Sequence, residues 1–323
     1  MYDILKIVEN DFRHFNAGAL RDATVGYVSH IENGGKMFIA MAGAMSSAEL
    51  GVSLAPMIKN EKIHGISVTG ANLEESIFRL IGNDNYSDVY NYRYFQKDDD
   101  ASLLANGYRR ITDMVFSEDK VVNKVRAFLY KEWKEAQENG ERYFPHEYFY
   151  KVLNNPAFKK LYTGNPDECW MLEACKKSLP IVVPGWEDST IGNLFSGYCK
   201  KGIFNPCIMK SGIEYMMSFY DIYKALSQNN AGVGFFQIGG GISGDFPICV
   251  VPSIKLDLEE DAKPWAYFCQ ISDSVTSYGS YSGATPNEKI TWDKLTSKTP
   301  MYVIESDATI VFPLIAHYVL EKK

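Results

Sequence analysis

The chain has 323 residues, of which 46% are hydrophobic and 23% are charged, and its formal net charge is -7. This composition is typical of a globular protein that buries a large core without disulfides, and the acidic balance argues against a nucleic-acid partner. Since there is neither an apolar run of about 18 residues nor an apolar N-terminal segment, we expect no membrane span and no secretory signal. The six cysteines form no C-x-x-C pair, so we expect free thiols, no metal and a cytoplasmic location.

The first predicted elements alternate as they do in α/β folds. Residues 2–32 contain few helix breakers and space their apolar residues by three and four, which predicts helices. Residues 36–45 form an apolar run of strand length that ends in small residues, and a helix is predicted to begin at Ser46. A strand over 63–69, a turn and a helix from Leu73 repeat the pattern.

The middle of the chain is more polar. Residues 82–110 predict a loop outside the core, and we interpret the acidic run 98–100 within it as a solvated charged turn in preference to a metal site. Residues 117–180 predict helices, with breaks near Asn139-Gly140 and Gly164-Asn165-Pro166.

The remaining strands are predicted from short apolar runs at 181–184, 234–238, 266–271 and 301–304, with helices near 212–229 and 310–321. No linker or repeat divides the chain. We therefore predict an α/β fold: a single large Rossmann-like domain over 1–323 with a mostly parallel sheet flanked by helices. It would consist of an N-terminal helical segment, 1–35, and a core, 36–323.

Ligands of such sheets bind beyond the carboxyl ends of the strands. The predicted strand ends carry Ser46-Ser47, Thr69-Gly70-Ala71, Asp188-Ser189, Gly239-Gly240-Gly241 and Asp307-Ala308. Glycines and helix N-termini let backbone N–H groups approach phosphates, and aspartates there can bind ribose hydroxyls. Neither a G-x-G-x-x-G fingerprint nor a P-loop is present.

The segment 278–294 is the densest in reactive and shape-determining residues. Its Gly, Ser and Pro residues indicate a shaped loop, and Trp292 precedes Lys294 by two positions. An aromatic wall that excludes water from an amine favours the neutral form, which alone is a nucleophile. By residue type alone, a surface lysine remains the commoner interpretation.

The stretch from Ser282 to Lys294, S-G-A-T-P-N-E-K-I-T-W-D-K, resembles the catalytic loop of deoxyhypusine synthases, S-G-A-x-P-x-E-x-x-S/T-W-x-K. Four other segments are similar to motifs of that family and occur in the same order. They are 68–75 (V-T-G-A-N-L-E-E), 184–192, 238–241 (I-G-G-G) and 307–314 (D-A-T-I-V-F-P-L).

The resemblance implies an NAD-dependent aminoalkyl (aminobutyl) transferase in which Lys294 forms an imine with a fragment of a polyamine. It implies a substrate pocket that includes Glu288 and Trp292, and a homotetramer with sites shared between paired subunits. The implied cofactor residues are Ser46, Thr69, Glu75, Asp188, Gly240, Asp307 and Ala308. The acceptor would be the lysine of a translation factor or a small polyamine.

Several pocket positions depart from the family pattern. Asn193 and Tyr281 stand where the family has acids that bind ammonium groups, and Asp245 stands in place of a histidine proton carrier. Two alternatives to a deoxyhypusine synthase therefore remain open. One is a polyamine-forming enzyme like homospermidine synthase, and the other is a divergent protein that binds NAD or amines without turnover.

Overall fold

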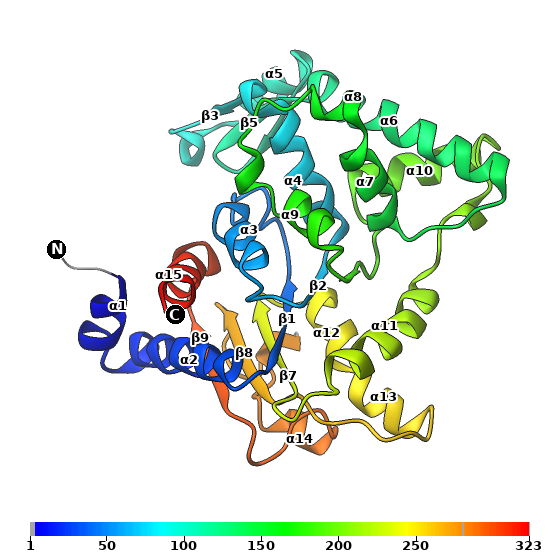
Figure 1. Cartoon of the computed structure of the whole chain (residues 1–323). Coiled ribbons are helices and arrows are strands. Elements are labelled where there is room, and N and C mark those ends of the chain that lie inside the picture. The colour runs from blue at the N-terminus through cyan, green and yellow to red at the C-terminus, as the bar shows by residue number, and fades with distance from the viewer. Residues whose placement is uncertain (1–3, 280, 323) are drawn as a thin grey trace.

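The computed structural model describes residues 4–279 and 281–322. The N-terminal part is helical, as predicted, but it is interrupted at residues 12–14. It consists of α1 (Ile4–Lys6), a π-helical turn (Ile7–Asp11) and α2 (Phe15–Glu32). α1 and α2 contact α15 (Ala308–Glu321), so the first and last helices lie on the same side of the molecule (Figure 1).

The core of the fold is a six-stranded parallel sheet in the order β6-β2-β1-β7-β8-β9. The strands are β1 (Lys36–Met41), β2 (Gly65–Val68), β6 (Ile181–Val182), β7 (Val233–Ile238), β8 (Tyr267–Ser272) and β9 (Met301–Glu305). Counted along the chain, this order is 3-2-1-4-5-6, which is that of doubly wound dinucleotide-binding folds. The predicted fold class is confirmed.

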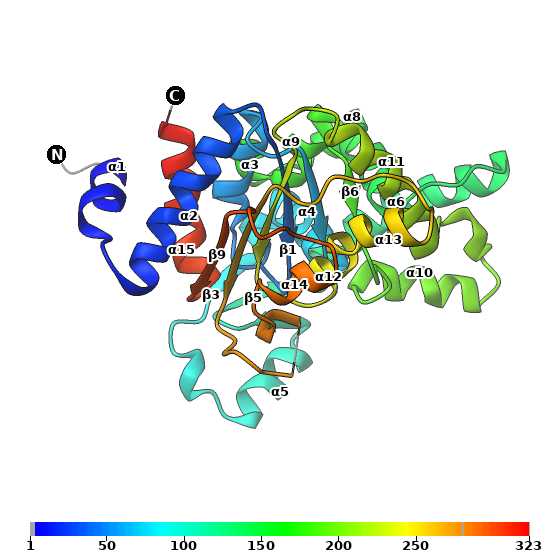
Figure 2. The ribbon, with the colours of Figure 1, turned by 90° about the horizontal axis from the view of Figure 1, so that it is seen from below.

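The central strands are buried almost throughout because helices cover both faces of the sheet, and most of their residues are apolar. Figure 2 shows α2 and α15 on one side, with α12 (Ile242–Ile248) and α13 (Val250–Leu256) on the other. Neighbouring side chains of β7 serve opposite faces: Phe236 packs against Tyr27 of α2, and Phe235 against Trp265 and Phe268.

The remaining helices surround this sheet. They are α3 (Gly51–Lys59), α4 (Gly70–Gly82), α6 (Glu118–Asn139), α7 (Pro145–Asn154), α8 (Pro156–Lys159), α9 (Trp170–Lys177), α10 (Thr190–Lys200), α11 (Gly212–Leu226) and α14 (Glu288–Thr291). Short 3-10 turns lie at 83–85, 92–94, 166–168, 206–208 and 281–283. The predicted helix break at residue 140 is confirmed, since Gly140 ends α6 with a φ of 69°.

Two predictions about the first half were wrong. The helix after β1 begins at Gly51, not at Ser46, because residues 43–50 form turns with a left-handed Glu49 at φ 57°. The predicted loop 82–110 contains helix α5 (Lys97–Ala105) and contributes to a second, antiparallel sheet. That sheet has the order β3-β5-β4, with β3 (Tyr86–Asp88), β4 (Tyr108–Ile111) and β5 (Met114–Ser117).

The acidic run 98–100 serves structure. Asp99 accepts a hydrogen bond from the backbone N–H of Gln96 at the start of α5, and Asp100 forms an ion pair with Arg110. Within the described residues, no group of three or more His, Cys, Asp or Glu side chains is arranged to hold a metal ion. Over the same residues, the structure has no helix with the length and apolar character to span a membrane.

Candidate active site

The switch point of the sheet lies between β1 and β7. From β1 the chain goes to β2 and β6 on one side, and from β7 it goes to β8 and β9 on the other. The connections after β1 and β7 therefore leave in opposite directions and open a crevice beyond their carboxyl ends. The glycine turn, Gly239-Gly240-Gly241, ends β7 there, with φ values of 81° at Gly239 and 78° at Gly241 that favour glycine.

The loop that carries Lys294 lies directly on this glycine turn. A Cβ added to Gly240 would lie 2.6 Å from Oγ and 2.9 Å from Cβ of Ser282, so no larger residue fits without movement. The side-chain amide of Gln270 on β8 donates to the carbonyl of Ser282 at 2.8 Å, which fixes the loop to the sheet. Two of the motifs singled out in the sequence therefore meet at the switch point.

Lys294 is half-buried in the segment that follows α14. Its N–H donates to the carbonyl of Lys289 at 3.0 Å, and its carbonyl accepts from the N–H of Trp265 at 3.0 Å. Its Nζ lies 5.9 Å from the ring centroid of Trp292, within reach of a cation–π contact. Asp245, in the first turn of α12 after the glycine turn, interacts electrostatically with Lys294, while partial burial raises the pKa of the Asp245 carboxyl.

The loops after β1 and β2 are held together by the fully buried Asn72. Its amide Nδ2 donates to the carbonyl of Gly43 and to Oγ1 of Thr69, and its Oδ1 accepts from the N–H of Ser46. The Ser46 hydroxyl donates to the carbonyl of Asn72 and accepts from the indole of Trp170. Thr69 caps α4, and its Oγ1 also contacts the carbonyl of Gly43 at 3.1 Å.

Two adjacent carboxylates of α4 have different roles. Glu74 is buried and accepts hydrogen bonds from the N–H groups of Thr190 and Ile191, at the N-terminus of α10. Burial raises its pKa to about 7, although these two donors oppose the shift. Glu75 accepts from the hydroxyl of Ser47, and burial likewise raises its pKa.

The other predicted site residues lie in turns and helix ends outside the contact between Gly240 and Ser282. Asp188 is exposed in the turn before α10, where Asn193 donates to the carbonyls of Glu187 and Ser189. A Cβ added to Gly185, in the same turn, would lie 3.4 Å from the side chain of Ile242, so this turn approaches the start of α12.

Asp307 is exposed and caps α15 through the N–H of Thr309, and Ala308 is buried behind it. Glu288 is exposed at the start of α14. The side chain of Tyr281 lies outside the described part of the structure.

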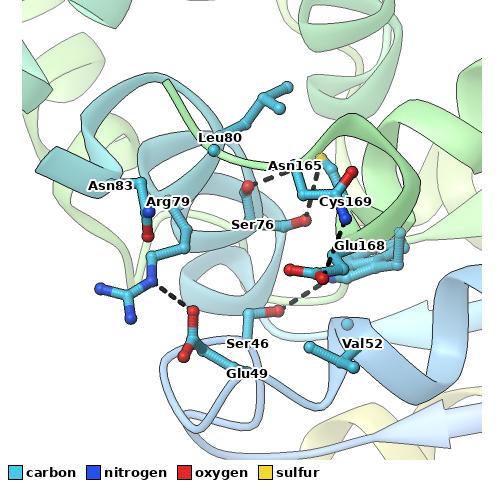
Figure 3. A pocket seen from close by; sticks show the side chains of 13 residues that line it. Ser46, Glu49, Val52, Ser76, Arg79, Leu80, Asn83, Asn165, Glu168 and Cys169 are labelled. Carbon is cyan, nitrogen blue, oxygen red and sulfur yellow. Dashed lines mark hydrogen bonds and ion pairs between the residues drawn. The ribbon is translucent and has the colours of Figure 1, made fainter. Parts of the chain in front are cut away.

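Two cavities lie near the strand ends. One of about 130 Å³ lies behind Ser46, where Glu49 pairs with Arg79 and Ser76 contacts Cys169 at 3.3 Å (Figure 3). The other, of about 270 Å³, lies between α4, α6 and the small sheet. Its lining residues are Glu75, Phe78, Tyr86, Arg109, Ile111, Phe116, Glu118, Val122 and Thr190. Neither is lined by Gly240 or Lys294, so we place the candidate site at the switch point between β1 and β7.

The switch point fits a dinucleotide in two respects. The strand order is that of dinucleotide-binding sheets, and the glycine turn exposes backbone there. Gly43 adds open backbone after β1, because a Cβ there would meet no atom within 4 Å.

The sequence alone did not reveal three residues of this region. Asn72 stands in a small-residue turn, which signals a turn but not the partners of its amide. Glu74 resembles any acid in the first turns of a helix. Lys289 is only 3% exposed and interacts with Asp245 and Lys294, yet it occupies a loop position where a lysine is ordinarily solvated.

Comparison with known proteins supports the resemblance to deoxyhypusine synthases. A "Deoxyhypusine synthase-like protein" from Nostoc sp. is 27% identical, covering 99% of this chain and 82% of its own. A "Probable deoxyhypusine synthase 2" from Methanosarcina acetivorans is 25% identical, covering 88% and 77%. An Entamoeba histolytica crystal structure, described as a candidate deoxyhypusine synthase, has the same fold. Its TM-score is 0.59 at 12% identity, over 98% of this chain and 92% of its own.

The sequence model of the family described as "Deoxyhypusine synthase" matches residues 8–319, which is almost the whole chain. The chain belongs to the deoxyhypusine synthase family.

Proposed function

We propose that this protein is an NAD-dependent aminoalkyl transferase that works through an imine on Lys294. Its family is one of transferases that move an aminobutyl group, which supports the reaction class. The observation that carries the proposal is the position of the loop bearing Lys294, which packs through Ser282 on the glycine turn at the switch point. A second link supports the proposal, because Asp245, which follows the glycine turn in α12, interacts electrostatically with Lys294.

The residues proposed to hold NAD surround the switch point. Gly240 would let the dinucleotide approach the backbone, while Thr69, Glu75 and Asp188 follow β2 and β6. Asp307 and Ala308 follow β9, and Ser46 positions the loop after β1 through Asn72. When bound, NAD would supply a hydride acceptor for the amine carbon and later return that hydride, so no net oxidation results.

Lys294 would act as the nucleophile. Its neutral amine would attack the imine carbon of the oxidised substrate, the original amine would leave, and the fragment would stay on Nζ until an acceptor amine displaces it. Trp292 would pack along the aliphatic chain and exclude water. Asp245 and Glu288 would offset the charge of a cationic substrate, and the net charge of -7 favours its approach.

The substrate is proposed to be a polyamine, and the acceptor either a protein lysine, such as that of a translation factor, or a small polyamine. Asn193 and Tyr281 are neutral residues at the positions where the resemblance implies acids that bind ammonium groups. We therefore propose a donor amine that presents fewer ammonium groups to the pocket. We also propose that copies pair within a homotetramer. Trp292 exposes 66% of its surface, and a second copy that covers it would dry the site around Lys294.

Borohydride trapping tests the proposal. The full chain is incubated with NAD and a panel of polyamines and guanidino-amines, reduced, digested and analysed by mass spectrometry. We expect an added aminoalkyl mass on the peptide that contains Lys294, only when NAD is present, together with small amine products and no net NADH.

Matched lysine variants localise the chemistry. Lys294→Arg should abolish the adduct, whereas Lys298→Arg, an exposed lysine in the same loop, should leave it unchanged. If NAD binds but no amine gives an adduct, the protein is a binding protein without turnover. Net accumulation of NADH would instead indicate an ordinary dehydrogenase. Either result rejects the imine mechanism.

A further inference from the structure

A second lysine is buried beside Lys294. Lys289 in α14 is 3% exposed, and its Nζ lies 5.0 Å from the ring centroid of Phe268 on β8. Lysines are among the residues least often buried, because transferring an ammonium from water to an apolar setting is costly. The usual role of a lysine, which is to keep the protein surface soluble, therefore does not explain why Lys289 packs against the sheet.

Lys289 is coupled to Lys294 through both backbone and charge. The carbonyl of Lys289 accepts the N–H of Lys294 at 3.0 Å, so the two lysines share one short turn. Burial lowers the pKa of Lys289 to about 8, with a further lowering from the Lys294 ammonium, while Glu288 and Asp245 act in the opposite direction. At neutral pH a substantial minority of Lys289 is therefore a neutral amine.

Among the described residues, charged and aromatic groups that interact with Lys289 come from three parts of the fold. Asp245 of α12 is attracted to both ammonium groups. Glu288 and Lys294 come from α14 and the residues after it, where Asp293 is already paired with Lys255 of α13 at 2.7 Å. The strand β8 contributes an aromatic ring, Phe268, and no charge at the contact. One buried carboxylate-associated amine thus sits next to the proposed nucleophile.

We propose that Lys289 is the proton carrier of the Lys294 site, an inference that rests on the proposed function. In the exchange of amines on the imine carbon, the nitrogen of Lys294 must lose a proton and the leaving nitrogen must gain one. Neutral Lys289 takes the proton from the Lys294 nitrogen, directly or through Asp245, and gives it to the leaving amine. One C–N bond forms and one breaks, and the charge of Lys289 is restored at the end without any redox change.

The test compares two replacements of Lys289 in the full chain. Lys289→Met preserves length without charge, and Lys289→Arg preserves charge without a proton that can leave. The rate of the NAD-dependent adduct on Lys294 is measured between pH 6 and 10. We expect the rate of adduct formation to fall about 100-fold or more in both variants. The wild-type rate should rise as the pH passes through about 8, and both variants should lack this rise. Lys298→Arg is the matched control.

A merely electrostatic or structural role predicts that Lys289→Arg restores the rate, and that outcome overturns the proposal. An absent adduct in the wild type overturns the proposed function and this inference together, whereas a normal adduct in both Lys289 variants overturns this inference alone.

A readout without turnover covers the case in which the variants do not fold. Titration of the lysine Cε signals of the wild type by NMR across the same pH range should give Lys289 a midpoint well below that of a free lysine. Lys294→Met should raise this midpoint. A midpoint at about 10.4, the value of a free lysine, would contradict the proposal.

Discussion

Replacement of Gly240 by alanine would separate the function of the crevice from the stability of the fold. The new Cβ would lie 2.6 Å from Oγ and 2.9 Å from Cβ of Ser282, both shorter than real Cβ contacts. Such overpacking costs about 1–3 kcal/mol. Since the loop is the more movable partner, the strain should shift the loop that carries Lys294. We expect adduct formation to slow by roughly 5- to 150-fold, and the melting temperature to fall by no more than a few degrees, because the displaced loop relieves part of the strain.

The double-mutant cycle with Ser282→Gly makes this expectation specific. Removing both crowding atoms of Ser282 should restore most of the rate in the Gly240→Ala background. The single Ser282→Gly variant loses the 3.2 Å contact with Ser274 and should be weakened only modestly. Adduct rates and thermal melting of all four proteins are compared. If Gly240→Ala is fully active, or if Ser282→Gly gives no rescue, the loop does not rest on the glycine turn as described.

Three further predictions concern stability. Asp307→Ala removes the cap of α15 and should cost about 1 kcal/mol in urea unfolding; a neutral result would mean that Thr309 is capped otherwise. Leu129→Ala leaves a cavity under a fully buried side chain and should cost about 2–5 kcal/mol, so a cost below 1 kcal/mol by the same assay would argue against its burial. Burial lowers the pKa of His146 to about 3, so the unfolded chain takes up a proton first as pH falls below about 6.5. Stability should therefore fall between pH 6.5 and 3, and His146→Gln should flatten this slope in unfolding curves; an unchanged slope would refute the assignment.

The sequence predicted the elements whose apolar runs are long or whose boundaries carry distinct residues. Runs such as 234–238 and 266–271 had to be strands because a buried parallel sheet needs nearly continuous apolar residues. The antiparallel sheet β3-β5-β4 is not predicted from the sequence because its strands have only three or four residues and β4 is largely exposed. Such short strands show no clear alternation of apolar and polar residues. The sequence predicts a helix from Ser46, where the structure has turns at 43–50, because small residues occur both in turns and at the starts of helices.

The candidate site was predicted in part. Its strand-end residues followed from the general behaviour of parallel sheets, and Lys294 followed from a resemblance between motifs. The contact between Gly240 and Ser282 joins residues 42 positions apart, and no local pattern encodes it. The burial of Lys289 is likewise a tertiary property, because the same letters in an isolated loop would leave its ammonium in water.

In the proposed function, binding of the cationic substrate and protonation of Lys289 are thermodynamically linked. A polyamine bound beside Lys294 adds positive charge near Lys289, which disfavours the charged form of Lys289 in the same way that Lys294 does. By reciprocity, release of the proton from Lys289 strengthens binding of the cation. Under the proposed function, binding of a cationic substrate would therefore favour the neutral amine of Lys289. Asp245 limits this effect, because its carboxylate attracts the substrate and both lysines alike.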